Sequence, residues 1–145
     1  NLNISSNTIV IYSKTNGYGI TINNTTNSFI EENTIFINSS KAKGIIIYSG
    51  MELELNKNSL SLFENESSTS NQNNQIESSV IEFSKDSKTL NIQQNIIDTN
   101  VKSIFVYNSH GVRINIGPNK FFIGDYNFLN YFTDKNNGLL YNAIK

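Results

Sequence analysis

Apolar and polar residues alternate with a period of two along most of this chain. The segment LNISSNTIVI at 2–11 places apolar residues at alternate positions on both sides of an Asn, and FIEENTIFI at 29–37 repeats that arrangement. Such alternation is typical of strands that bury one face. No segment carries a comparable apolar stripe with a period of 3.6 residues. The pattern therefore predicts short strands and no long helix.

The phrase around this Asn occurs five times, at spacings of 26, 25, 37 and 24 residues. An aliphatic residue stands three positions before each Asn, and an apolar residue stands two positions after it. The three columns are Asn7, Asn33, Asn58, Asn95 and Asn119; Ile4, Ile30, Leu55, Ile92 and Ile116; and Ile9, Ile35, Leu60, Ile97 and Phe121. Between the copies a further strand recurs, as GITIN at 19–23, GIIIY at 44–48, VIEF at 80–83, SIFVY at 103–107 and GLLYN at 138–142. The repeat predicts coils that each hold about three short strands.

A period near 25 residues with three strands per coil resembles the right-handed parallel β-helix of pectate lyase-like enzymes, NosD-like periplasmic proteins and phage tailspikes. The resemblance covers nearly the whole chain and lies in its apolar pattern, not in a catalytic signature. It implies an all-β, single-stranded solenoid of about five coils. Residues 1–123 are expected to form the coils and residues 124–145 the last coil or a C-terminal cap, within a longer protein. A left-handed hexapeptide helix is the alternative, but it requires an aliphatic residue at every sixth position.

The Asn column is predicted to be structural. Coils of a solenoid stack about 4.8 Å apart, so the five Asn side chains are expected to form an internal hydrogen-bonded ladder. We place this ladder at the bend between the second and third strands of each coil. Asn also tolerates the left-handed backbone of a tight bend. The ladder residues are therefore not expected to bind a ligand.

Large side chains are predicted on the outer face of the GITI sheet. If Ile20, Ile45 and Ile81 point inward, one outward column contains Thr21, Ile46, Glu82 and Phe105, and the next contains Asn23, Tyr48, Ser84 and Tyr107. Exposed apolar groups favour a protein contact, whereas Tyr, Phe and Asn together also suit a glycan. The predicted substrate-binding residues are Tyr48, Phe105, Tyr107 and Asn23. A one-residue error in alignment would turn these groups inward.

Two long connections, at 63–78 and at 124–137, are expected on one edge of the solenoid. Each is either an insertion without a task or a flap that borders a groove. Acidic residues near this edge and on the GITI sheet are weak catalytic candidates, namely Glu82, Asp98 and Asp125. Glycoside hydrolysis uses two carboxylates at a defined separation. The sole His, His110, is expected to be an ordinary turn residue, with a general base as the alternative.

The amino-acid composition argues against metal binding, nucleic-acid binding and a membrane span. There is no Cys and one His, so neither a metal site nor a cofactor is predicted. The net charge of −1 gives no basic surface for nucleic acid, and no apolar run is long enough to span a membrane.

The leading hypothesis is a carbohydrate-engaging β-helix segment of a larger extracellular, cell-surface or virion protein, with polysaccharide recognition and a role in processing as an option. The alternative is a non-catalytic structural or adhesive stalk. The stalk would pack an apolar stripe against other copies, as in a trimer, or against flanking domains. We lean against catalysis for this segment itself.

Overall fold

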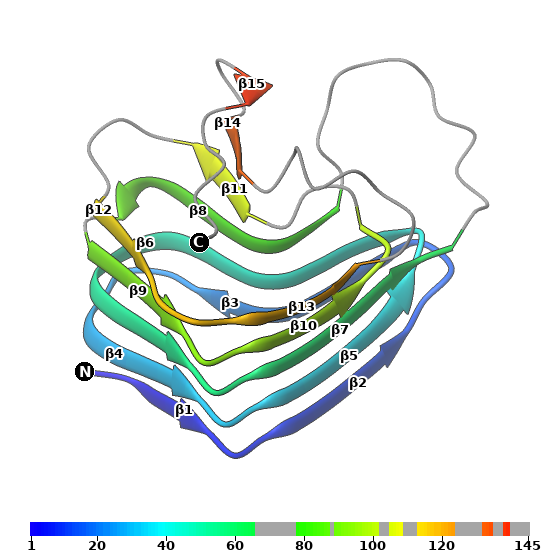
Figure 1. Cartoon of the computed structure of the whole chain (residues 1–145), viewed down its shortest axis with the longest axis horizontal. Helices are drawn as coiled ribbons and strands as arrows, with labels where there is room; N and C mark the ends of the chain where they lie inside the picture. The colour runs from blue at the N-terminus through cyan, green and yellow to red at the C-terminus, as the bar shows by residue number, and fades with distance from the viewer. Residues whose placement is uncertain are drawn as a thin grey trace.

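Strands that recur along the sequence lie directly above one another in the structure, a computed structural model (Figure 1). It describes residues 1–65, 78–87, 89–101, 105–108, 113–123, 132–134 and 138–139. The strands are β1 (Asn3–Ser5), β2 (Thr8–Tyr12), β3 (Asn16–Ile22), β4 (Thr25–Glu31), β5 (Thr34–Ser39), β6 (Lys41–Asn56), β7 (Ser59–Glu64), β8 (Ser79–Ser87), β9 (Thr89–Gln93), β10 (Ile96–Thr99), β11 (Phe105–Asn108), β12 (Arg113–Ile116), β13 (Lys120–Ile123), β14 (Phe132–Asp134) and β15 (Gly138–Leu139). No helix occurs in this part of the chain.

The strands pair in parallel from one coil to the next and form a β-solenoid of about four turns. A five-stranded sheet has the order β13-β10-β7-β5-β2. A ten-stranded sheet supplies the other two faces, and its long strand β6 pairs with β3 and β8 in its first half and with β4 and β9 in its second half. The predicted all-β parallel solenoid is therefore confirmed.

Register follows the Asn repeat. Ile4 pairs with Ile30, and Ile30 with Leu55, on the strands before the bend. Ile9 pairs with Ile35, and Ile35 with Leu60, on the strands after it. Equivalent residues of successive coils thus occupy the same position in the stack, as the columns predicted.

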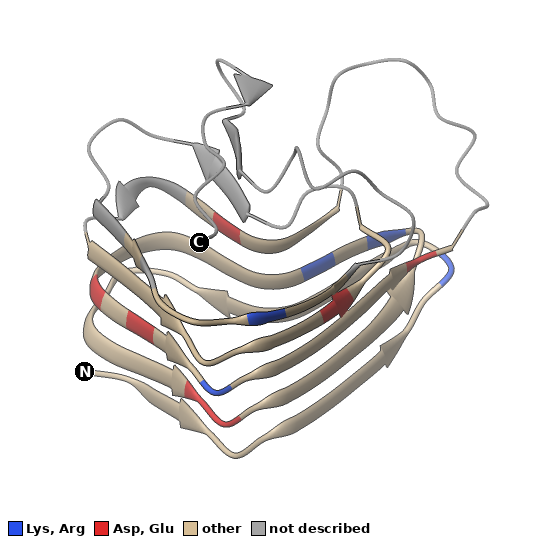
Figure 2. Cartoon of the chain, viewed as in Figure 1, with Lys and Arg blue, Asp and Glu red and all other residues tan. Residues whose placement is uncertain are grey.

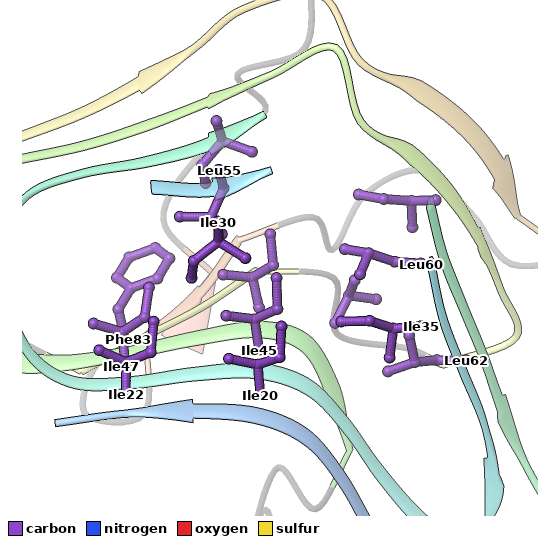
Figure 3. Close-up of a cluster of buried hydrophobic side chains, with 14 of the residues drawn as sticks. Ile20, Ile22, Ile30, Ile35, Ile45, Ile47, Leu55, Leu60, Leu62 and Phe83 are labelled. Carbon is purple, nitrogen blue, oxygen red and sulfur yellow. The ribbon is translucent and has the colours of Figure 1, made fainter. Parts of the chain in front are cut away.

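The interior is a stack of aliphatic side chains (Figure 3). The view shows Ile22, Ile47 and Phe83 in one column, Ile20 and Ile45 in a second, and Ile35 and Leu60 in a third. Most core residues from the second coil onward are completely buried. Burial of one such side chain contributes about 1.5–3 kcal/mol. The hydrophobic column, repeated coil by coil, is what holds the strands in register.

The bend at the ladder differs from the prediction in one respect. The left-handed backbone falls on the residue before each of the first four ladder Asn residues, with φ values of 56° at Ser6, 57° at Glu32, 54° at Lys57 and 56° at Gln94. The ladder Asn residues do not take the positive φ that the sequence analysis assigned to them. The hydrogen bonds of the side-chain amides therefore explain why Asn recurs at this position. The tolerance of Asn for the left-handed region does not explain it.

The two predicted long connections lie mostly outside the described residues, which omit 66–77, 124–131 and 135–137. His110 and Asp125 also lie outside them. Within the predicted last coil or cap, β14 continues the parallel stack from β11, whereas β15 pairs with β14 in the antiparallel sense.

Candidate functional site

The Asn ladder is continuous over the five predicted residues. The main-chain N–H of Asn33 donates to Asn58 Oδ1 at 3.1 Å, and the Asn33 side-chain Nδ2 donates to the same oxygen at 3.0 Å. Asn7, Asn58 and Asn95 donate to the Asn of the following coil in the same way. Each rung therefore joins two coils through one shared oxygen.

Each ladder amide above the first coil also binds the coil below it. The Nδ2 of Asn33 donates to Ile4 O at 2.8 Å, and that of Asn58 donates to Ile30 O at 2.8 Å. Asn33, Asn58 and Asn95 are each 1% exposed. Buried amide groups satisfied in this way stabilise the bend, and they have no access to a ligand. The expected structural role agrees with this geometry.

The outer face of the GITI sheet differs from the prediction at Ile46. This side chain was expected to be exposed, but it is only 3% exposed. Its neighbour in the column, Glu82, is 7% exposed and lies with Oε2 2.7 Å from Lys43 Nζ. Ser79 Oγ donates to the same carboxylate at 3.4 Å. This part of the face is a covered ion pair, not an open apolar stripe.

Strand β11 is shifted by one residue relative to the predicted alignment. Phe105 pairs with Ile81, and Tyr107 pairs with Phe83. The sequence analysis had aligned Phe105 with Glu82 and Tyr107 with Ser84. The sequence analysis predicted that Phe105 and Tyr107 are exposed because it aligned them with Glu82 and Ser84. The observed pairing does not support that argument.

Two of the predicted substrate-binding residues do lie on the surface. Tyr48 is 51% exposed, and Asn23 is also exposed. They follow Ile47 and Ile22, which pair with one another in β6 and β3. The two side chains therefore occupy matching positions on adjacent coils and form a small polar and aromatic surface.

The weak catalytic candidates are not brought together. Glu82 lies on β8 of the ten-stranded sheet, and Asp98 lies exposed on β10 of the five-stranded sheet. Asp125 falls outside the described residues. The pair that glycoside hydrolysis requires is therefore not formed by Glu82 and Asp98. Within the described part, no group of three or more His, Cys, Asp or Glu side chains is placed to hold a metal ion.

Among the described residues, aromatic rings contact one another on the outer face of the five-stranded sheet. The rings of Tyr12 and Phe36 are 5.5 Å apart between centroids, and those of Phe36 and Phe63 are 5.9 Å apart. We call these three residues the aromatic row. Tyr12 is 74% exposed, and the two Phe side chains are half-buried. The row therefore crosses three consecutive coils on an accessible face.

Polar groups surround the aromatic row. Asn38 pairs with Tyr12 in the coil before and with Phe63 in the coil after. Its Oδ1 is buried and has no hydrogen-bond partner among the described residues. Thr8 and Thr34 are exposed on the same strands. Figure 2 shows few charged residues on these strands, and Glu64 is the only one in β2, β5 and β7. The surface is aromatic and polar but almost uncharged.

The aromatic row was missed by the sequence analysis although its signal was present. In TIVIY, TIFIN and SLSLF, the apolar residues on either side of the inward ones are Val10, Tyr12, Phe36 and Phe63. Because Ile9 and Ile11 belong to the core columns, their neighbours must point outward. The same alternation that identified the core thus identifies the row.

No protein-family model matches the sequence, and comparisons with curated proteins and with solved structures find no match. In the described part of the chain, no helix is long and apolar enough to cross a membrane. A function for this chain is therefore inferred from the chemistry of its own surface residues.

Proposed function

We propose that this chain is a non-catalytic, carbohydrate-recognising segment of a larger extracellular, cell-surface or virion protein. We further propose that its solenoid is right-handed and belongs with the pectate lyase-like, NosD-like and tailspike-like β-helices that its sequence resembles. The observation that carries the proposal is the aromatic row Tyr12–Phe36–Phe63 on three strands that hold one charged residue, Glu64.

Aromatic rings and amide groups are complementary to a sugar chain. The apolar face of a sugar ring stacks on an aromatic ring, while its hydroxyls exchange hydrogen bonds with hydroxyl and amide groups. The row occupies three consecutive coils, so it extends over about 10 Å, which suits several linked sugar rings. An uncharged face favours a neutral or weakly charged glycan over a polyanion.

The placement of the described carboxylates supports recognition without cleavage. Glu82 is engaged by Lys43 at 2.7 Å and lies in a different sheet from the aromatic row. Asp98 is exposed on the same sheet as the row. The other acidic residue described in β2, β5, β7 and β10 is Glu64, which accepts a hydrogen bond from Ser78 Oγ at 3.2 Å.

A second candidate function is a structural or adhesive stalk. Three further apolar residues are exposed on the five-stranded sheet, with Val10 at 57%, Ile96 at 43% and Phe122 at 59%. Exposed apolar surface of this kind favours a protein contact. The partner would be another copy, as in a trimer, or a flanking domain.

The deciding experiment is a binding screen of the chain against neutral, capsular and pectic polysaccharides, with Tyr12→Ala and Tyr48→Ala as a matched pair. We expect Tyr12→Ala to weaken glycan binding about two- to twelvefold, since an aromatic contact contributes about 0.5–1.5 kcal/mol. Tyr48→Ala removes another exposed tyrosine, from the ten-stranded sheet, and should leave binding unchanged.

Other outcomes of the screen identify other functions. Loss of binding in Tyr48→Ala alone would place the glycan on the Tyr48–Asn23 surface. Shortening of the bound glycan would make the chain an enzyme. No glycan binding, combined with self-association that Tyr12→Ala or Phe122→Ala reduces, would favour the stalk.

A further inference from the structure

Asn38 is an asparagine that the internal ladder does not use. It lies on β5, which pairs with β2 on one side and with β7 on the other. Its Oδ1 is buried and has no hydrogen-bond partner among the described residues. The Oδ1 of Asn58, by contrast, accepts from both the main-chain N–H and the Nδ2 of Asn33. The structural role that explains Asn58 therefore does not explain Asn38.

The surroundings of Asn38 are aromatic. Ile37 belongs to the core and is 0% exposed, so the alternation of the strand places Asn38 on the outer face. Phe63 is its register partner in the next coil, and Phe36 lies two residues before it on the same strand. Strands β5 and β7 each pair with a strand on both sides. The Asn38 amide therefore lies within the aromatic row and inside the stack.

The unpartnered Oδ1 makes the amide available to a ligand. An acceptor that is removed from water without a partner raises the free energy of the folded chain. A donor on a bound ligand removes that cost when it reaches the oxygen. The amide can turn about its terminal torsion, which is broad, and because Oδ1 has no partner to lose, the turn breaks no hydrogen bond at this atom.

Asn56 provides a comparison on the other sheet. Its Oδ1 is also buried without a partner among the described residues. It lies on β6, and its register partners are Glu31 and Gln93, neither of which is aromatic. The ring contacts of the described chain lie beside Asn38 and not beside Asn56. The combination of a free amide and aromatic rings therefore distinguishes Asn38.

This combination is complementary to an acetamido group on a sugar. A side-chain amide offers an acceptor oxygen and donor hydrogens, and an acetamido group offers an N–H donor and a carbonyl acceptor, so the two can share two hydrogen bonds. The acetyl methyl group is apolar and suits the faces of Phe36 and Phe63. A pair of sugar hydroxyls supplies hydrogen bonds but no apolar group. The acetamido group is also uncharged, like most of this face.

We propose that Asn38 is the specificity-determining residue of the aromatic row and that it selects glycans built from N-acetylated amino sugars. Its Oδ1 accepts from the acetamido N–H, its Nδ2 donates to the acetamido carbonyl, and the methyl group packs on Phe36 and Phe63. The inference rests on the proposed function, because it places the sugar chain on the aromatic row.

The test compares two hexasaccharides that have the same linkage. Chitohexaose carries an acetamido group where cellohexaose carries a hydroxyl, and the two sugars are otherwise alike. Each is titrated into the 145-residue protein and followed by isothermal titration calorimetry. We expect chitohexaose to bind about tenfold more tightly than cellohexaose, because the acetamido group adds hydrogen bonds and an apolar contact.

A pair of variants tests the residue. Asn38→Leu replaces the amide with an apolar side chain of similar shape. We expect it to bind the two hexasaccharides equally and to melt at or above the temperature of the parent protein, because it removes a buried acceptor without a partner. Asn56→Leu is the matched control. It removes the other such amide, from the ten-stranded sheet, and should keep the tenfold preference.

Four results would overturn the inference. These are no binding of either hexasaccharide, a preference for cellohexaose or none in the parent protein, an unaltered preference in Asn38→Leu, and an Asn38→Leu protein that fails to fold or melts well below the parent. The last result would mean that the amide is structural. If the inference fails while another polysaccharide of the screen binds in a Tyr12-dependent way, the proposed function stands, and if no polysaccharide binds, both fail.

Discussion

Asn58 shows why an amide is required at each bend. Its Oδ1 accepts from the main-chain N–H and the Nδ2 of Asn33, and its Nδ2 donates to Ile30 O and Asn95 Oδ1. Aspartate would lack the donors, and serine would lack the second hydrogen. Only a short side chain with both an acceptor oxygen and two donor hydrogens meets all four contacts.

We therefore expect Asn58→Ala to lower the free energy of unfolding by about 2–4 kcal/mol, because it leaves buried groups such as Ile30 O without their side-chain partner. Asn7→Ala is the matched control. Asn7 lies exposed at the end of the ladder, and its side-chain Oδ1 accepts no hydrogen bond from the described residues, so loss of its side chain should cost about 1 kcal/mol. Denaturant titration of both variants measures the difference. Equal costs would mean that the ladder does not stabilise the interior more than the end.

At the scale of the element, strand β6 explains why alternation alone does not assign every face. Ala42 is fully buried, and so are Ile45 and Ile47, so the inward phase changes around Gly44. The pairing of β6 with β8 also shifts in register between Ile47 and Ser49. A strand that turns a corner or contains a bulge resets its period of two. Strand β11 also lies one residue away from the predicted alignment, with a continuous register against β8.

Gly44 itself is expected to be essential to this corner. A Cβ placed there would lie 2.5 Å from the main-chain oxygen of Val80 and 3.3 Å from the Leu62 side chain. We expect Gly44→Ala to destabilise the protein by about 2–3 kcal/mol, because the obstructing atom is backbone and cannot rotate away.

Gly50→Ala provides the comparison for Gly44. Its added Cβ meets mainly the Leu53 side chain, with Cδ1 at 2.4 Å, and a side chain is able to change rotamer at smaller cost. Thermal unfolding of both variants is the measurement. A Gly50→Ala variant less stable than Gly44→Ala would show that the corner tolerates a methyl group and that the Leu53 packing does not.

At the scale of the whole molecule, the sequence predicted what repeats and not what departs from the repeat. The Asn column, the core columns and the parallel stack followed from regular spacing, because each coil packs against its neighbours through equivalent residues. The buried state of Ile46 and the register of Phe105 did not follow. The burial of Ile46 depends on the groups that cover the outer face of its sheet, and the pairing of Phe105 depends on the local register of β11. Neither is encoded in the period-two alternation of apolar and polar residues.

The sequence predicted the type of residue in the candidate site but not the sheet on which the site lies. Exposed aromatic residues were expected, and Tyr48 is exposed. The aromatic row, however, lies on the five-stranded sheet, where the strands around Ile9 and Ile35 had been considered only for their inward side chains. Its arrangement became apparent only when the outward residues of three coils were placed side by side.

The final prediction concerns how stability is distributed along the stack. Each coil contacts only its neighbours, so a coil with one neighbour has about half the contacts of an interior one. Among the described strands, β2 pairs only with β5. We expect amide hydrogen exchange to be at least tenfold faster in Ile9 and Ile11 of β2 than in Ile35 and Ile37 of β5, because the first coil opens without the rest.

Exchange can be measured by NMR on the 145-residue chain, with β5 and β7 as the reference for strands that have a neighbour on each side. Uniform protection of β2 and β5 would mean that the solenoid unfolds as one cooperative unit.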